Sequence, residues 1–119
     1  MAKILVVEDS IDARQMMVDL VESLGYMALE AKDGVDGVRV ALTEHPDLIL
    51  LDLMMPTASG DSALRFMRGT PGLADLPILV VSAHPDVEKI ARQNGASGWI
   101  AKPITLNELR TRIDSLLKK

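Results

Sequence analysis

The residues of this sequence that could do chemistry are three acids, a hydroxyl and an amine, all at or just after the ends of apolar runs. The acids are Glu8, Asp9 and Asp52, the hydroxyl is Ser82 and the amine is Lys102. Carboxylates bind hard divalent cations, whereas hydroxyl and ammonium groups bind phosphoryl oxygens. If the apolar runs are parallel strands, these side chains meet at the carboxyl edge of one sheet.

Convergence of Glu8, Asp9 and Asp52 would require positive charge nearby. Two carboxylates about 5 Å apart repel each other by about 3 kcal/mol at an effective dielectric constant of about 20. Mg²⁺ would offset this repulsion, because it prefers oxygen ligands and keeps waters beside one or two carboxylates and a substrate phosphate. We therefore expect a Mg²⁺ site with Asp9 and Asp52 as direct ligands.

Asp52 is the expected nucleophile. A carboxylate is already ionised at neutral pH, so it needs no general base. Phosphoryl transfer depends mainly on positioning and on neutralised oxygens. Mg²⁺ and the Lys102 ammonium would each bind one phosphoryl oxygen and the Ser82 hydroxyl another, while the small side chain of Ala83 leaves room for the group.

The elements that must position these residues alternate along the chain. Short apolar runs predict buried strands at residues 4–7, 26–31, 48–51, 78–81 and 99–101. Apolar residues at helical spacing predict helices that include residues 17–24, 35–42, 61–68, 85–95 and 105–117. Gly25 suits a helix C-terminus, Pro85 a first helical position, and Thr105 with Glu108 a capping box. This alternation predicts an α/β fold of five βα units, with a parallel sheet covered on both faces.

Composition limits the function classes. The 119 residues predict a single domain over residues 1–119. The absence of cysteine excludes disulfides and thiolate sites, and the net charge of -4 argues against nucleic-acid and membrane partners. No apolar run approaches the roughly 20 residues of a membrane span, and the N-terminus lacks a signal-peptide pattern, so we expect a cytoplasmic protein.

Taken together, these residues resemble the receiver domains of response regulators in two-component signalling. The motifs that carry the resemblance are Glu8-Asp9, Asp52 followed by Met55-Pro56 and Gly60, Ser82-Ala83, and Gly95-Ala96-Ser97-Gly98-Trp99 leading to Lys102-Pro103. The resemblance extends from Lys3 to about Leu117. It implies a flavodoxin-like doubly wound (βα)5 fold with strand order 2-1-3-4-5. It also implies that Asp52 accepts a phosphoryl group from a phosphohistidine on a sensor histidine kinase or a phosphotransfer protein.

The resemblance also implies further site residues. Glu8 would act on Mg²⁺ through water and the Met54 backbone carbonyl would be a ligand, while the backbone N–H groups of Met54 and Ala83 would bind phosphoryl oxygens. Ser82 would move toward the phosphoryl group and the ring of Trp99 would turn inward. This switch would change the surface from about residue 84 to residue 117 for a downstream effector protein or a homodimer. The peptide bond before Pro103 is expected to be cis.

Met54 and His84 each stand two residues after a site residue, and we hypothesise that they set the lifetime of the phosphoryl group. An apolar Met54 would impede the hydrolytic water, and His84 would order it. The alternative for His84, a solvent-exposed loop histidine, stays open.

Other function classes disagree with particular residues. A phosphatase with an aspartyl intermediate usually has a second acid two residues after the nucleophile, where this chain has Met54. No GxxxxGK[ST] or GxGxxG motif follows the first strand, which argues against nucleotide binding. We therefore expect no enzyme beyond assistance to its own phosphorylation and dephosphorylation. A docking module that is independent of phosphorylation remains the alternative, and the chain is either a stand-alone receiver or a domain of a longer regulator or hybrid kinase.

Overall fold

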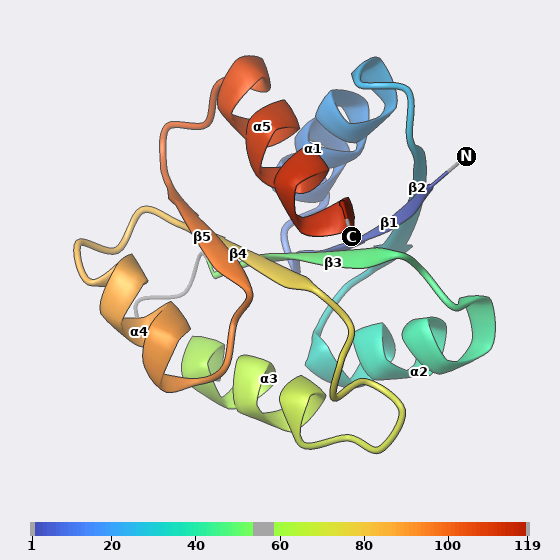
Figure 1. Cartoon of the computed structure of the whole chain (residues 1–119), viewed down its shortest axis with the longest axis vertical. Coiled ribbons are helices and arrows are strands. Elements are labelled where there is room, and N and C mark those ends of the chain that lie inside the picture. The colour runs from blue at the N-terminus through green and yellow to red at the C-terminus, as the bar shows by residue number, and fades with distance from the viewer. Residues whose placement is uncertain (1, 54–58, 119) are drawn as a thin grey trace.

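The computed structural model describes residues 2–53 and 59–118, except for the side chains of residues 59–61. Strands and helices alternate along these residues (Figure 1). The strands are β1 (Lys3–Val7), β2 (Met27–Ala31), β3 (Leu48–Asp52), β4 (Ile78–Ser82) and β5 (Gly98–Ala101). The helices are α1 (Ile11–Ser23), α2 (Gly34–Glu44), α3 (Ser59–Arg68), α4 (Val87–Gln93) and α5 (Leu106–Leu117).

The strands form one parallel sheet in the order β2-β1-β3-β4-β5. Val7, at the end of β1, lies beside Leu51 of β3, and Asp52 lies beside Val81 of β4. The carboxyl ends of the central strands therefore share one edge, where ligands bind in open sheets of this kind. The predicted fold class, a flavodoxin-like doubly wound sheet, is confirmed.

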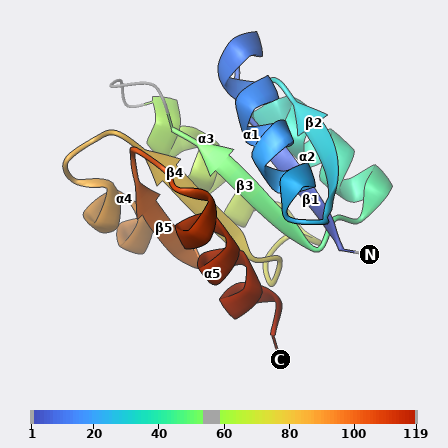
Figure 2. The ribbon, with the colours of Figure 1, turned by 90° about the horizontal axis from the view of Figure 1, so that it is seen from above.

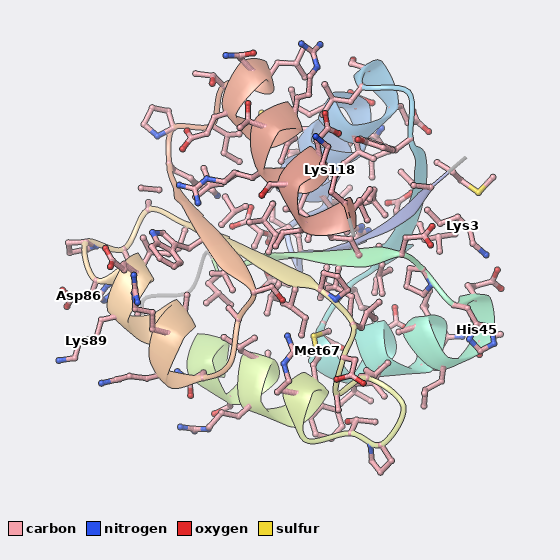
Figure 3. All side chains as sticks on the ribbon, in the orientation of Figure 1. Lys3, His45, Met67, Asp86, Lys89 and Lys118 are labelled. Carbon is pink, nitrogen blue, oxygen red and sulfur yellow. The ribbon has the colours of Figure 1, made fainter. Side chains whose placement is uncertain are left out.

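Helices cover both faces of the sheet. Figures 1 and 2 show α1 and α5 on one face and α2, α3 and α4 on the other. Each face has its own core of Leu, Ile, Val and Met side chains. Met67 of α3 points inward and is fully buried (Figure 3), and its methyl group would lie 2.5 Å from a Cβ added at Gly37 of α2. Within the described residues, no helix has the length and apolar character needed to cross a membrane.

Local sequence explains where the helices begin and end. The side chains of Ser10, Asp33 and Thr105 each accept a hydrogen bond from a backbone N–H of the first turn that follows. Gly25 ends α1 with a φ of 93°, a conformation that costs glycine little. The capping signal at Thr105 therefore correctly indicated the start of α5.

Two local predictions differ from the structure. Helix α4 begins at Val87 rather than at Pro85, because Pro85 and Asp86 form a turn in which the His84 carbonyl accepts from the Val87 N–H at 3.2 Å. The helical spacing predicts Val35, Val38, Ala41 and Leu42 on the buried face of α2, but that face centres on Val38 and Ala41, and Val35 and Leu42 are 71% and 47% exposed.

Candidate functional site

Asp52 and Lys102 form an ion pair at the carboxyl edge of the sheet. Lys102 Nζ lies 2.9 Å from Asp52 Oδ2, and the Asp52 side chain is only 1% exposed. Asp52 ends β3, while Lys102 follows β5 and donates its backbone N–H to the Ser82 carbonyl at 2.9 Å. The sheet thus brings together two residues that are 50 positions apart in the sequence.

Glu8 lies at the same edge, directly after β1, and is 2% exposed. Its Oε2 accepts a hydrogen bond from the Ser10 N–H at 2.8 Å. Burial, together with the neighbouring carboxyl groups of Asp9 and Asp52, raises the pKa of Glu8 to about 8, although the Ser10 N–H opposes this shift. Glu8 therefore lies close enough to Asp9 and Asp52 for their carboxyl groups to affect its protonation, while the Asp9 side chain itself is exposed.

The oxygen atoms left over at this edge fit a hard cation. Glu8 Oε1 and Asp52 Oδ1 are buried and have no hydrogen-bond partner among the described residues. In that same part of the chain, no three His, Cys, Asp or Glu side chains close into a ligand cluster. Mg²⁺ does not require such a cluster, because it binds through one or two carboxylates and keeps several waters. Two orphaned carboxylate oxygens among acids that repel one another are what such an ion would satisfy.

Ser82 joins the end of β4 to the segment that follows Asp52. Its buried hydroxyl donates to the Leu53 carbonyl at 2.9 Å and accepts from the His84 N–H at 3.0 Å. The imidazole Nδ1 of His84 in turn accepts from the Asp86 N–H at 3.0 Å. The His84 side chain is half-buried and is hydrogen-bonded within its turn.

A pocket of about 500 Å³ opens beside the ion pair. Its lining residues are Met16, Met17, Leu20, Asp52, Ala83, Lys102, Pro103 and Ile104. The peptide bond between Lys102 and Pro103 is cis. One wall of the pocket is the apolar side of α1, and Met16 on that wall is 58% exposed. Met16 lies off the apolar stripe that predicts α1, so the helical spacing did not indicate that Met16 faces this pocket.

Trp99 of β5 is half-buried between two arginines. The guanidinium carbon of Arg92 on α4 lies 4.9 Å from the centre of the ring, and that of Arg112 on α5 lies 5.9 Å from it. Both distances allow a cation–π attraction. The apolar run at residues 99–101 predicted that Trp99 lies on a strand, but sequence spacing predicted neither arginine contact.

Several predicted site features lie outside the described residues. They are the backbone groups of Met54 and the loop residues Met55 and Pro56. Gly60 lies within α3, and only its backbone is described. Glu8, Asp52, Ser82 and Lys102 gather at one edge of the sheet, and Ala83 lies with two of them in the pocket.

Comparisons with known proteins agree with this geometry. The family model described as the response regulator receiver domain matches residues 4–114. The chain is 35% identical over 119 residues to the probable transcriptional regulator ycf27 of Cyanophora paradoxa, covering 98% of this chain but only 48% of that protein. It is 32% identical over 117 residues to the polar-differentiation response regulator DivK of Brucella ovis, covering 96% of this chain and 94% of DivK. The chain thus spans about half the length of ycf27 and nearly all of DivK.

A solved structure is similar over nearly its whole length. It is the receiver domain of a sensor histidine kinase from Pseudomonas aeruginosa PAO1, with a magnesium ion coordinated in its active-site cleft. The TM-score is 0.83 at 29% sequence identity, and the match covers 98% of this chain and 97% of that one.

Proposed function

This chain belongs to the response regulator receiver domain family, and on that premise we propose that Asp52 accepts a phosphoryl group from a phosphohistidine. The observation that carries the proposal is the 2.9 Å contact between Lys102 Nζ and a buried Asp52 carboxylate whose other oxygen has no partner among the described residues. A surface acid needs neither burial nor such a cation, whereas a phosphoryl acceptor needs both positioning and positive charge.

The transfer balances as an in-line displacement. An Asp52 carboxylate oxygen forms a bond to phosphorus, the bond between phosphorus and the imidazole nitrogen breaks, and the leaving nitrogen keeps the electron pair. The products are an aspartyl phosphate and a histidine side chain that takes up a proton. Lys102 neutralises negative charge on the phosphoryl oxygens as they approach.

Glu8, Asp9, Asp52 and the Met54 carbonyl are the groups we propose hold Mg²⁺, which supplies further positive charge to the phosphoryl oxygens when bound. Support comes from the two orphaned oxygens, Glu8 Oε1 and Asp52 Oδ1. The ion coordinated in the Pseudomonas aeruginosa receiver domain supports the same assignment by similarity. The backbone N–H groups of Met54 and Ala83 are proposed to bind the remaining phosphoryl oxygens.

The donor is proposed to be a sensor histidine kinase or a histidine phosphotransfer protein that approaches through the pocket beside Asp52. The Asp52 side chain is only 1% exposed, and this pocket, which Asp52 helps to line, gives a donor an approach to it. The apolar part of the pocket lining, which includes Met16 of α1 and Ile104 before α5, offers the donor a surface to cover.

Phosphorylation is proposed to act on the α4–β5–α5 surface through Ser82 and Trp99. If Ser82 rotates toward the phosphoryl group, it gives up its bonds with the Leu53 carbonyl and the His84 N–H. The turn before α4 then loses an anchor, and the ring of Trp99 has room to move inward. A downstream effector or a second copy of the chain would recognise the changed surface, which makes the domain a regulator rather than an enzyme.

Met54 and His84 are proposed to set the lifetime of the aspartyl phosphate. The test is to time dephosphorylation in Met54→Asn and His84→Ala, and unchanged lifetimes would remove the idea. Because the His84 imidazole accepts from the Asp86 N–H, His84→Gln is a useful second variant that keeps a side-chain acceptor.

Mass spectrometry after incubation with acetyl phosphate and Mg²⁺ tests the proposed function. We expect the chain to gain one phosphoryl group, and we expect Asp52→Asn to gain none. A control with Asp86→Asn, an exposed acid in the turn before α4, should react like the wild type. A wild type that stays unmodified by every phosphodonor would favour the phosphorylation-independent docking module instead.

A further inference from the structure

We propose that Arg14 is a positioning residue that fixes Glu8 and thereby raises the affinity of the site for Mg²⁺. The inference rests on the proposed function, because it assigns a supporting residue to the same metal site. Arg14 lies on α1 outside the pocket and has no contact with Asp52 or Lys102 among its hydrogen bonds in the structure. Its influence would pass through Glu8 alone.

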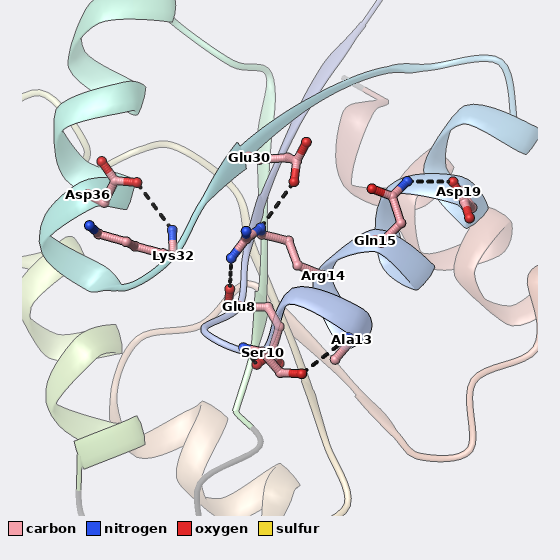
Figure 4. A network of polar contacts seen from close by, with 9 residues as sticks. All are labelled: Glu8, Ser10, Ala13, Arg14, Gln15, Asp19, Glu30, Lys32 and Asp36. Carbon is pink, nitrogen blue, oxygen red and sulfur yellow. Dashed lines mark hydrogen bonds and ion pairs between the residues drawn. The ribbon is translucent and has the colours of Figure 1, made fainter.

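The Arg14 guanidinium bridges the loop that follows β1 and the edge strand β2 (Figure 4). Its Nη1 donates to the Glu8 carbonyl oxygen at 2.9 Å, and its Nε donates to Glu30 Oε1 at 3.0 Å. The Arg14 side chain is 18% exposed and that of Glu30 is 49% exposed. One planar group thus ties together three elements next to the proposed metal site.

With Arg14 in place, Glu8 is fixed on almost every side. Its backbone N–H donates to the Ala31 carbonyl at 3.1 Å, its carbonyl accepts from Arg14, and its Oε2 accepts from the Ser10 N–H. Only Oε1 has no partner among the described residues. A carboxylate already held in place loses less conformational freedom when it binds an ion, directly or through water.

Glu30 has two roles in this arrangement. It orients the guanidinium so that both donors meet their acceptors, which a fork-shaped arginine can do and a lysine with a single nitrogen cannot. It also balances the positive charge of Arg14, which would otherwise oppose the arrival of a cation. Because Glu30 is half exposed, we expect its energetic contribution to be smaller than that of Arg14.

Isothermal titration of the full chain with Mg²⁺ tests the inference, with urea unfolding of each metal-free variant alongside. We expect Arg14→Met to weaken Mg²⁺ binding about tenfold, Arg14→Lys to weaken it less, and Glu30→Gln to weaken it about two- to threefold. Arg39→Met is the matched control, since it removes an equal charge from the ion pair with Asp36, which does not contact Glu8. We expect its Mg²⁺ affinity to equal that of the wild type.

The sign of the effect separates this role from its alternatives. Removing a cation should tighten Mg²⁺ binding if only charge matters, so tighter or unchanged binding in Arg14→Met overturns the proposal. If Arg14 had only a structural role, Arg14→Met would lower the free energy of unfolding and leave the Mg²⁺ dissociation constant at the wild-type value. That result would also overturn the proposal. If the wild type itself binds no Mg²⁺, the proposed metal site fails together with this inference. Mg²⁺ binding that is weakened in Arg14→Met and Glu30→Gln, but not in the wild type or in Arg39→Met, supports both the metal site and the role of Arg14.

Discussion

The Ser82 hydroxyl donates a 2.9 Å hydrogen bond to the backbone carbonyl of Leu53, the residue directly after Asp52. This bond crosses from β4 to the end of β3 and is buried. The same hydroxyl oxygen accepts a hydrogen bond from the His84 N–H, so this one atom connects the end of β3 with the turn before α4. Any movement of Ser82 toward Asp52 therefore has a defined cost, which can be measured in the unmodified protein.

Ser82→Ala should lower the free energy of unfolding by about 1–2 kcal/mol. The substitution leaves the Leu53 carbonyl and the His84 N–H without their shared partner, and a buried polar group that loses its partner costs about this much. Urea unfolding measures the change. Ser23→Ala is the matched control, because the exposed Ser23 hydroxyl bonds only to the Asp19 carbonyl of its own helix, and its effect should stay within about 0.5 kcal/mol. Equal effects in the two variants would contradict the role given to Ser82.

Glu8→Gln should stabilise the metal-free protein. Because burial and the neighbouring acids raise the pKa of Glu8 to about 8, the wild type loses free energy of unfolding as the pH rises from about 4.5 through 8. Glutamine has no such proton to lose, so at pH 8 the free energy of unfolding of Glu8→Gln should exceed that of the wild type by about 2 kcal/mol. Unfolding in urea across this pH range, in the presence of a chelator, provides the measurement.

The matched control for this variant is Glu22→Gln on the exposed face of α1, which should leave the pH profile unchanged. The advantage of Glu8→Gln should shrink when Mg²⁺ is added, since binding of an ion to the wild-type carboxylates stabilises the folded state. A variant that is less stable than the wild type at pH 8 without metal would show that Glu8 is not held against other acids.

Arg68→Met should destabilise the chain by about 2–3 kcal/mol. The Arg68 guanidinium donates to the carbonyls of Leu73, Ala74, Leu76 and Gly95 at 2.9–3.0 Å. These bonds join the loop before β4 to the loop before β5, and burial lowers the pKa of the group somewhat. Arg65→Met, on an exposed position of the same helix, is the control and should change stability by less than about 0.5 kcal/mol. Similar losses in both variants would refute the bridging role.

The sequence predicted the sheet because buried parallel strands are nearly continuous apolar runs, such as Leu48 to Leu51. It also predicted the start of α5, because the capping signal at Thr105 is local. The predicted start of α4 at Pro85 was wrong, because proline is compatible both with a first helical turn and with the non-helical turn that Pro85 forms here. The prediction that Val35 is buried was also wrong, because helical spacing indicates a buried face but not which residues at the border of that face are covered.

For the site, the sequence predicted which residues stand at the ends of strands, and the sheet order then determined that they meet. The 2.9 Å pairing of Lys102 with Asp52 depends on side-chain conformation and was not predictable from spacing. The same is true of Arg14, whose two acceptors, the Glu8 carbonyl and Glu30, belong to different strands and loops. Contacts of this kind arise only when distant segments have folded together.

Trp99 should report the switch by fluorescence, and as the only tryptophan it makes the signal unambiguous. Addition of Mg²⁺ with beryllofluoride, a mimic of the phosphoryl group, should change its emission because the ring leaves Arg92 and Arg112. In Arg112→Met the starting emission should already differ, since one of the two cations is gone. Asp52→Asn is the control and should not respond to beryllofluoride. No change in the wild type would remove Trp99 from the proposed switch.

Tyr26 should titrate above an ordinary phenol, because it is partly buried and its hydroxyl donates a hydrogen bond to Asp114 Oδ1 on α5. Burial, together with the Asp114 carboxylate, raises the pKa of Tyr26 to about 12, although the Arg110 charge opposes the shift. As the only tyrosine, it can be followed by ultraviolet absorbance, and Asp114→Asn should lower the midpoint part of the way toward about 10, because burial remains. Because the folded-state pKa is the higher one, the contribution of this contact to stability is complete below about pH 10 and is lost as the pH rises through 12. A wild-type midpoint near 10 would mean that α5 is not tied to the segment before β2 through this hydroxyl.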